Sequence, residues 1–211
     1  MMIDNITDEA LEIYREIYPT KDITKQDIFY YVYGVLHHPG YRNKYEAFLV
    51  RDLPRIPFAP NFDVFVDVGK RLADLHMHWE SYPRYDLGDP LHPIPDKPYK
   101  MKFGDNGKDH TQFLVNNLLV YDNLPNVNYA VNGHTPHGWL TIKLKNHPYI
   151  NRYPFRYMTG EQIRIMLEKL IHIGLESDKI IQQLEKEDFE MDVDVTKFKH
   201  ANTLDKYTNR E

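Results

Sequence analysis

Apolar residues recur at helical spacing through the first third of the chain, and this pattern predicts a run of helices. The hydroxyl of Thr7, followed by two acids, marks the start of one helix, and Thr24 caps a second. Asn61 precedes a further helix, whose apolar side extends to Trp79. The expected helices cover residues 7–18, 24–36, 41–52 and 61–79.

Two proline-rich stretches interrupt the helical pattern. Residues 53–60 hold three prolines, which remove backbone N–H donors and favour an extended connector. Residues 82–98 hold five prolines, and we expect a long loop or a boundary between lobes there.

Beyond this loop the apolar period changes from about 3.6 to 2. Residues 99–103 alternate apolar and basic side chains, which predicts a strand with Lys100 and Lys102 on one face. Residues 104–107 form a turn, and residues 112–115 and 118–121 are the expected returning strands. The sequence therefore predicts a small, mostly antiparallel β section.

Helices return after the β section. We expect a short helix over 125–131, another that opens at 135–136, and the longest from Thr159 onwards. The fold class is α+β, with a helix-rich N-terminal part packed with the β section and further helices. One domain covers 1–184, divided into a helical part (1–81), a proline-rich loop (82–98) and a mixed basic part (99–184). We expect residues 185–211 to form an exposed or partly ordered charged tail.

Composition bounds the class of protein. The 211 residues are 42% hydrophobic, enough for one sizeable core, or a core with an appended lobe. The absence of cysteine excludes disulfides and thiolate metal sites. The N-terminus lacks the pattern of a signal peptide, and no run approaches the roughly 20 apolar residues that cross a bilayer. We expect a soluble, cytoplasmic protein that has no membrane partner.

Charge is distributed unevenly. The net charge is −5, yet residues 97–156 carry 8 Lys or Arg against 3 Asp or Glu. Residues 1–96 carry 10 Lys or Arg against 16 Asp or Glu. Chance clustering on a solvated face is one interpretation of the basic segment, and an anionic partner that docks on it is the other.

For nucleic acid, Lys and Arg neutralise phosphates while flat or amide side chains can contact base edges. The basic segment interleaves such residues, and Arg42 lies on the expected outward side of the third helix. The candidate DNA-binding residues are Lys100, Lys102, Lys108, His110, Asn132, His134, Lys143, Lys145, Arg152, Arg156 and Arg42.

Common active-site signatures are absent: the sequence has no Gly-rich phosphate loop, no His-Glu-x-x-His and no Gly-x-Ser-x-Gly. His76 and His78 are two residues apart on an expected helix and diverge, which favours core or interface histidines over a metal site. His37 and His38 suit the end of a helix, with a nucleic-acid contact as the alternative. We assign no catalytic, cofactor-binding or metal-binding residue.

A family resemblance adds to these observations. Residues 27–42, from Asp27-Ile28-Phe29-Tyr30-Tyr31 to His38-Pro39-Gly40-Tyr41-Arg42, are followed by Leu53-Pro54-Arg55-Ile56-Pro57. Further blocks cover 69–76, 99–103, 129–135 with Trp139-Leu140, and 172–177. In this order, over residues 6–184, the chain resembles the C-terminal specificity domain of single-chain type I (type ISP) restriction–modification enzymes.

The resemblance implies a target-recognition module. In such enzymes one polypeptide joins a nuclease, an ATP-driven helicase and an S-adenosylmethionine-dependent adenine methyltransferase to this domain. Double-stranded DNA and the methyltransferase and helicase domains of the same polypeptide are the implied partners. S-adenosylmethionine, ATP and Mg²⁺ are expected only in that parent enzyme, so this chain alone is not an enzyme. His137-Gly138 departs from the family's usual leucine–acid pair, and the tail beyond 184 lies outside the resemblance.

Two alternatives stay open. The chain is either a DNA-reading module or a protein–protein coupling module that docks on the methyltransferase or helicase domains and touches DNA little. In the second case the acidic N-terminal helices form the interface. A self-sufficient enzyme would need a catalytic constellation, and the sequence shows none of the motifs named above.

Overall fold

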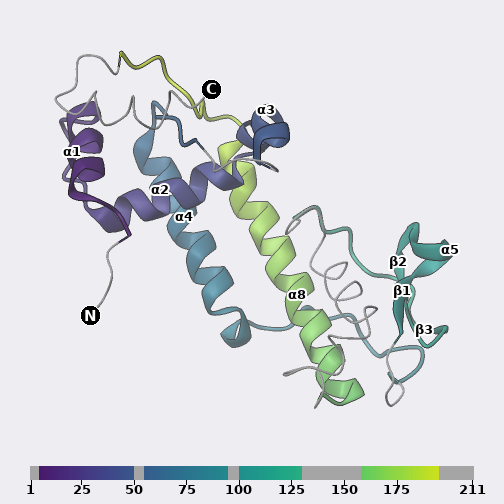
Figure 1. Ribbon diagram of the computed structural model, residues 1–211. Coiled ribbons are helices and arrows are strands. Elements are labelled where there is room, and N and C mark those ends of the chain that lie inside the picture. The colour runs from purple at the N-terminus through teal and green to yellow at the C-terminus, as the bar shows by residue number, and fades with distance from the viewer. Residues whose placement is uncertain (1–4, 50–54, 95–99, 130–157, 195–211) are drawn as a thin grey trace. The chain divides into compact units, whose positions relative to one another are not determined.

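The computed structural model describes residues 5–49, 55–94, 100–129 and 158–194 (Figure 1). Over these residues, helices accompany one three-stranded antiparallel sheet, which confirms the α+β class. The chain divides into two compact units. Unit 1 comprises Met1–Asp74 with Ile180–Glu211, and unit 2 comprises Leu75–Lys179.

The predicted N-terminal helices are confirmed, with small shifts at their ends. They are α1 (Asp8–Ile17), α2 (Lys25–His37), α3 (Pro39–Leu49) and α4 (Phe62–Met77). The Thr7 side chain accepts from the Ala10 N–H, and Thr24 and Asp27 form a capping box. Helix α3 begins two residues before the expected Tyr41, because a proline fits the first turn of a helix, where its missing N–H has no partner to lose.

Aromatic rings from three helices form the core of unit 1. Tyr14, Tyr31 and Phe62 pack together, with the Tyr31 and Phe62 rings stacked at 4.9 Å between centroids. Two glycines let α2 and α4 approach closely: a Cβ on Gly69 would lie 1.8 Å from the Tyr30 carbonyl oxygen. A Cβ on Gly34 would lie 2.4 Å from the Phe65 carbonyl oxygen. The helices therefore meet backbone against backbone at these positions.

Tyrosine hydroxyls hold the connector between α3 and α4. Its described part, residues 55–61, has no regular secondary structure, as the prolines predict. Its carbonyl groups accept hydrogen bonds from buried or partly buried phenols of α2, α3 and the residue after α1. The bonds are Tyr18 to Ala59 (2.7 Å), Tyr31 to Pro57 (2.8 Å) and Tyr41 to Arg55 (2.8 Å).

Residues 185–194, expected to belong to an exposed or partly ordered tail, are exposed or half-buried and make several contacts within unit 1. They follow the 3-10 turn η3 (Gln182–Leu184). The Phe189 ring lies 4.9 Å from that of His38, and the Met191 N–H donates to the Phe58 carbonyl at 2.7 Å. Lys44 pairs with Glu190. The apolar side chain of Phe189 anchors a stretch whose charge alone suggests solvent exposure.

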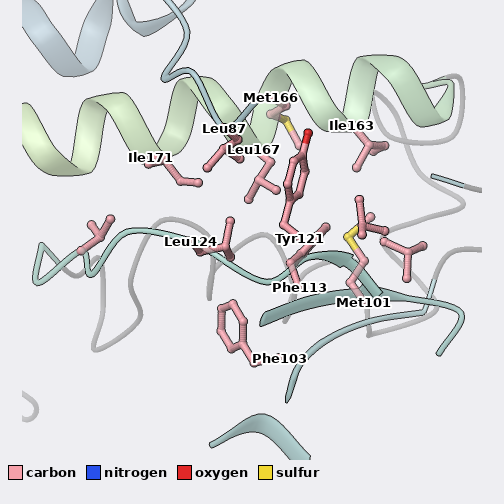
Figure 2. Close-up of a cluster of buried hydrophobic side chains, with 13 residues drawn as sticks. Leu87, Met101, Phe103, Phe113, Tyr121, Leu124, Ile163, Met166, Leu167 and Ile171 are labelled. Carbon is pink, nitrogen blue, oxygen red and sulfur yellow. The ribbon is translucent and has the colours of Figure 1, made fainter. Parts of the chain in front are cut away.

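Unit 2 places the sheet against the longest helix. The strands β1 (Met101–Phe103), β2 (Asp109–Val115) and β3 (Leu118–Tyr121) pair antiparallel in the order β1-β2-β3. Helix α8 (Gly160–Ile181) starts with the reciprocal capping bonds of Thr159 and Gln162. Figure 2 shows Phe113 and Tyr121 near Met166 and Leu167 of α8, within one buried cluster. The predicted strands and long helix are confirmed.

The short helix predicted over 125–131 is wrong for its described part. Residues 125–129 have no helical structure, because their backbone bonds go to distant partners. The Asn128 N–H donates to the Asp178 carboxylate at 2.9 Å, and the preceding Leu124 N–H donates to the Thr111 carbonyl. The helix expected to open at 135–136 lies outside the described residues. A 3-10 turn, η1 (Trp79–Ser81), precedes the proline-rich loop, whose described part, residues 82–94, contains no helix or strand.

Among the described residues, no helix is both long enough and apolar enough to span a membrane.

Candidate nucleic-acid interface

The β1–β2 hairpin brings together four of the predicted basic residues. Strand alternation buries Met101 and Phe103, so the intervening Lys102 points to the other face. The chain then reverses at α5 (Gly104–Gly107), a single turn in which Asp105 and Asn106 have φ of 43° and 54°. These left-handed values make it a tight reversal rather than a true helix, which agrees with the predicted turn.

A second tight turn fixes the position of Lys100. Asn116 and Asn117 join β2 to β3 with φ of 52° and 64°, the left-handed pair of a two-residue hairpin. The Asn116 N–H donates to the Lys100 carbonyl at 2.8 Å, and its side-chain oxygen accepts from the Lys100 N–H at 2.9 Å. The Lys100 backbone is therefore held while its side chain stays exposed.

The lysines of the hairpin are not paired with carboxylates among the described residues. Over the described residues, Lys100, Lys102 and Lys108 form no ion pair. The neighbouring Asp109 is engaged by Thr111, whose hydroxyl donates at 2.6 Å and whose N–H donates at 3.0 Å. These bonds hold the pKa of Asp109 below its usual value, so it stays ionised. The exposed His110 lies with its ring 4.7 Å from that of Phe103.

The other predicted residues belong to unit 1 or lie outside the described residues. Arg42 lies on α3 in unit 1, whereas Lys100, Lys102, Lys108 and His110 lie in unit 2. The remaining candidates lie outside the described residues: Asn132, His134, Lys143, Lys145, Arg152 and Arg156. The basic surface that can be described is therefore the hairpin alone.

Histidines at the end of α2 bond to their own chain. His38 is buried, its Nδ1 accepts from the Tyr41 N–H at 3.2 Å, and its Nε2 therefore carries the proton bonded to the Glu187 carbonyl at 3.0 Å. His37 Nδ1 bonds the Tyr33 carbonyl at 2.7 Å. The capping interpretation of this pair is supported over the nucleic-acid contact.

His76 has a structural role as well. Its Nε2 lies 2.9 Å from the Ser177 hydroxyl, and its ring stacks on that of Tyr129 at 5.2 Å. The core or interface interpretation of this histidine is supported. Within the described ranges, no group of three or more potential metal ligands comes together.

Sequence reasoning missed a charged cluster on α8. The Glu168 side chain is 5% exposed and accepts from Arg164 at 3.0 Å, while Arg84 lies 3.5 Å from its other oxygen. Burial raises the pKa of Glu168, and the two guanidinium groups oppose that rise. The spacing of Glu161, Arg164 and Glu168 on one helical face was a readable signal. No sequence signal pointed to Arg84, because only the fold brings it close to Glu168.

A pocket of about 440 Å³ adjoins this cluster. It lies where the loop after η1 passes α8, and the Tyr85 N–H fixes that crossing by donating to the Glu168 carbonyl at 3.1 Å. Arg84, Asp86 and Asp89 line it from the loop, and Arg164 and Glu168 from α8.

Solved structures of DNA complexes, two of them of Type ISP restriction–modification enzymes, resemble this chain. A nuclease-deletion mutant of the Type ISP enzyme LlaGI, in complex with a DNA substrate mimic, is 29% identical with a TM-score of 0.62. The match covers 81% of this chain and 14% of that one. A DrdV–DNA complex is 27% identical with a TM-score of 0.64. The match covers 85% of this chain and 20% of that one.

The ATP-dependent Type ISP enzyme LlaBIII bound to DNA shares the fold, at 22% identity and a TM-score of 0.65, over 88% of this chain and 12% of that one. This chain thus spans a fifth or less of the length of the proteins it matches. A comparison with curated proteins finds no similar sequence. The model of the Type ISP C-terminal specificity domain matches residues 2–152, and the chain therefore belongs to that family.

Proposed function

We propose that this chain recognises a DNA target sequence for a restriction–modification enzyme. The observation that carries the proposal is the β1–β2 hairpin, whose Lys100, Lys102 and Lys108 have no carboxylate partner among the described residues. Family membership supports it, as do two similar structures, at 29% and 27% identity, that are DNA complexes.

In this proposal the hairpin lies along a groove of double-stranded DNA. Its lysines neutralise phosphates that flank the groove, while β2 stays paired with both β1 and β3 in the three-stranded sheet. Asn106 and Asn117 sit exposed at the two turns, where an amide can bond a base edge. The packing of the three-stranded sheet on α8 holds the hairpin rigid, so binding costs little conformational entropy.

Chemistry would be supplied by other parts of a longer polypeptide. The methyltransferase, helicase and nuclease domains would bind S-adenosylmethionine, ATP and Mg²⁺, and this module would place the DNA before them. Such a protein would work in the cytoplasm, where it meets DNA. The small share of the matched proteins that this chain covers supports a modular role.

Binding to duplex DNA tests the proposal. The 211-residue chain is titrated with a labelled pool of duplexes of randomised sequence, at several salt concentrations. Changing Lys100, Lys102 and Lys108 together to Gln should lower the affinity and reduce the log–log salt slope by about 0.9 for each phosphate that is no longer neutralised. Lys70→Gln, a change of an exposed lysine in unit 1, is the matched control and should leave the slope unchanged. Equal slopes for the triple variant and the wild type would remove the hairpin from the interface.

A second candidate function rests on an exposed aromatic face of α2. Phe29 is 48% exposed and stacks on Tyr33 at 6.1 Å between ring centroids. Exposed aromatic side chains are typical of protein–protein contacts, so in this alternative unit 1 docks on the methyltransferase or helicase domains. Exchange of the domain between relatives separates the two candidates: a changed recognition sequence supports DNA reading, and a failure to assemble supports coupling.

A further inference from the structure

The charged cluster on α8 engages all three nitrogens of Arg164. Its Nε and NH2 atoms donate to the two oxygens of Glu161 at 2.9 and 2.8 Å, and NH1 donates to Glu168 at 3.0 Å. Three of its five N–H donors are therefore committed to carboxylates of its own helix. Arg164 therefore serves to hold the buried Glu168 in place.

Arg84 has the opposite character. Its side chain is 47% exposed, and its sole ion pair within the described residues is the 3.5 Å contact between NH1 and Glu168 Oε2. Glu168 itself is fixed by burial and by Arg164. The result is a guanidinium anchored on one side, with the rest of its donors available at the pocket that it lines.

The pocket suits a ligand edge with acceptors better than it suits a free phosphate. Asp86, Asp89 and Glu168 line it together with the two arginines, so carboxylates outnumber guanidinium groups. A phosphate would be repelled by those carboxylates. A guanine edge presents two adjacent acceptors, O6 and N7, that a guanidinium bonds in parallel, and its paired cytosine presents an amino donor that a carboxylate accepts.

We propose that Arg84 reads a guanine in the DNA target, held in position by Glu168. This inference rests on the proposed DNA-recognition function, and it assigns to that function a residue outside the basic hairpin. Arg84 contacts the base, and Glu168 acts through Arg84 as a positioning residue. A bidentate arginine–guanine contact discriminates against the other bases by roughly 5- to 150-fold.

Selection from a randomised duplex pool tests the proposal. The wild-type chain and its Arg84→Ala and Arg84→Lys variants are incubated with the pool, and the bound duplexes are sequenced. The wild type should select a motif that contains a required guanine. Both variants should lose the preference at that one position by the fold-change above and keep the rest of the motif. Lysine keeps the positive charge but lacks the two parallel N–H donors of the guanidinium group. A loss of the guanine preference in Arg84→Lys therefore distinguishes base reading from the effect of charge alone.

Arg71→Ala is the control, since Arg71 is a similarly exposed arginine in unit 1 that pairs with Asp67. Its motif should equal that of the wild type. Circular dichroism and the thermal unfolding midpoint establish whether each variant is folded. If Arg84→Ala does not fold, the comparison of motifs relies on Arg84→Lys.

Other outcomes overturn the inference. An unchanged motif in both Arg84 variants would show that Arg84 reads no base. A uniform decrease in affinity across all sequences, with a salt slope smaller by about 0.9, would make it a phosphate contact. If the wild type binds and selects no motif at all, the proposed function itself fails and the inference falls with it. A wild-type motif that survives in the Arg84 variants refutes the inference alone.

Discussion

The hydroxyl of Tyr31 donates a hydrogen bond to the Pro57 carbonyl at 2.8 Å and accepts one from the Ala59 N–H at 2.6 Å. Tyr31 is fully buried, and burial raises the pKa of its phenol far above the usual value. The phenol thus stays neutral and satisfies backbone groups on both sides of Phe58. It fixes the path of the connector from α3 to α4, where Pro57 itself has no N–H to offer.

Removal of this hydroxyl should destabilise unit 1. Tyr31→Phe leaves a buried carbonyl and a buried N–H without their partner, which costs about 1–3 kcal/mol. Urea unfolding followed by circular dichroism measures the change in the free energy of unfolding. Tyr30→Phe is the control, because the Tyr30 hydroxyl bonds only the exposed Gln26 among the described residues, and its removal should cost less than about 0.5 kcal/mol. Similar costs for the two variants would contradict the role of the connector bonds.

The close approach of α2 and α4 should not tolerate a side chain at Gly69. The Cβ of Gly69→Ala would lie 1.8 Å from the Tyr30 carbonyl oxygen, so the helices must separate. We expect the free energy of unfolding to fall by more than about 2 kcal/mol, since strain of this kind dominates the large destabilisations. Lys70→Ala, one residue along at an exposed position, should change the free energy of unfolding by less than about 0.5 kcal/mol. A stable Gly69→Ala variant would show that the helices pack differently.

The stability of the β2–β3 turn should respond differently to two substitutions. Asn117 has a φ of 64°, which glycine adopts without steric cost, so Asn117→Gly should be neutral or stabilising by up to about 1 kcal/mol. Asn116→Ala removes the side-chain oxygen that accepts from the Lys100 N–H, and it places alanine at a left-handed φ of 52°, which alanine adopts less readily. This change should destabilise the fold by about 1–2 kcal/mol. Thermal unfolding measures both, and a stabilised Asn116→Ala variant would contradict the role of Asn116 in the turn.

Stability should fall as the pH drops through the histidine range. Burial lowers the pKa of His37 below its usual value, although the bond to the Tyr33 carbonyl opposes the shift and Arg42 adds to it. The folded state therefore binds this proton less readily than the unfolded state, so stability rises with pH around the unfolded pKa of about 6.5. Urea midpoints at about pH 5.5 and pH 7.5 should differ less in His37→Gln than in the wild type. Identical pH dependence in the two proteins would exclude His37 as the source.

Local signals in the sequence determined the four N-terminal helices, the long helix α8, the strands and the candidate hairpin. Thr7 and Thr24 cap where their side chains can reach the first free N–H groups, and alternation at 101–103 buries every second residue. The left-handed turns at 105–107 and 116–117 follow from Asn, Asp and Gly, the residues that accept positive φ. Each of these features depends on neighbours within a few positions, which is why a single sequence suffices to predict them.

Tertiary structure alone decided which distant residues meet. The pairing of Arg84 with Glu168, the phenol bonds to residues 55–59 and the packing of Phe189 on His38 all join segments far apart in the chain. The non-helical path of 125–129 is set by the carboxylate of Asp178, a partner that no local pattern reveals. Charge and hydropathy describe a residue by itself, whereas desolvation and hydrogen bonding depend on what the fold places beside it. The basic hairpin was therefore predictable from the sequence, and the Arg84 pocket was not.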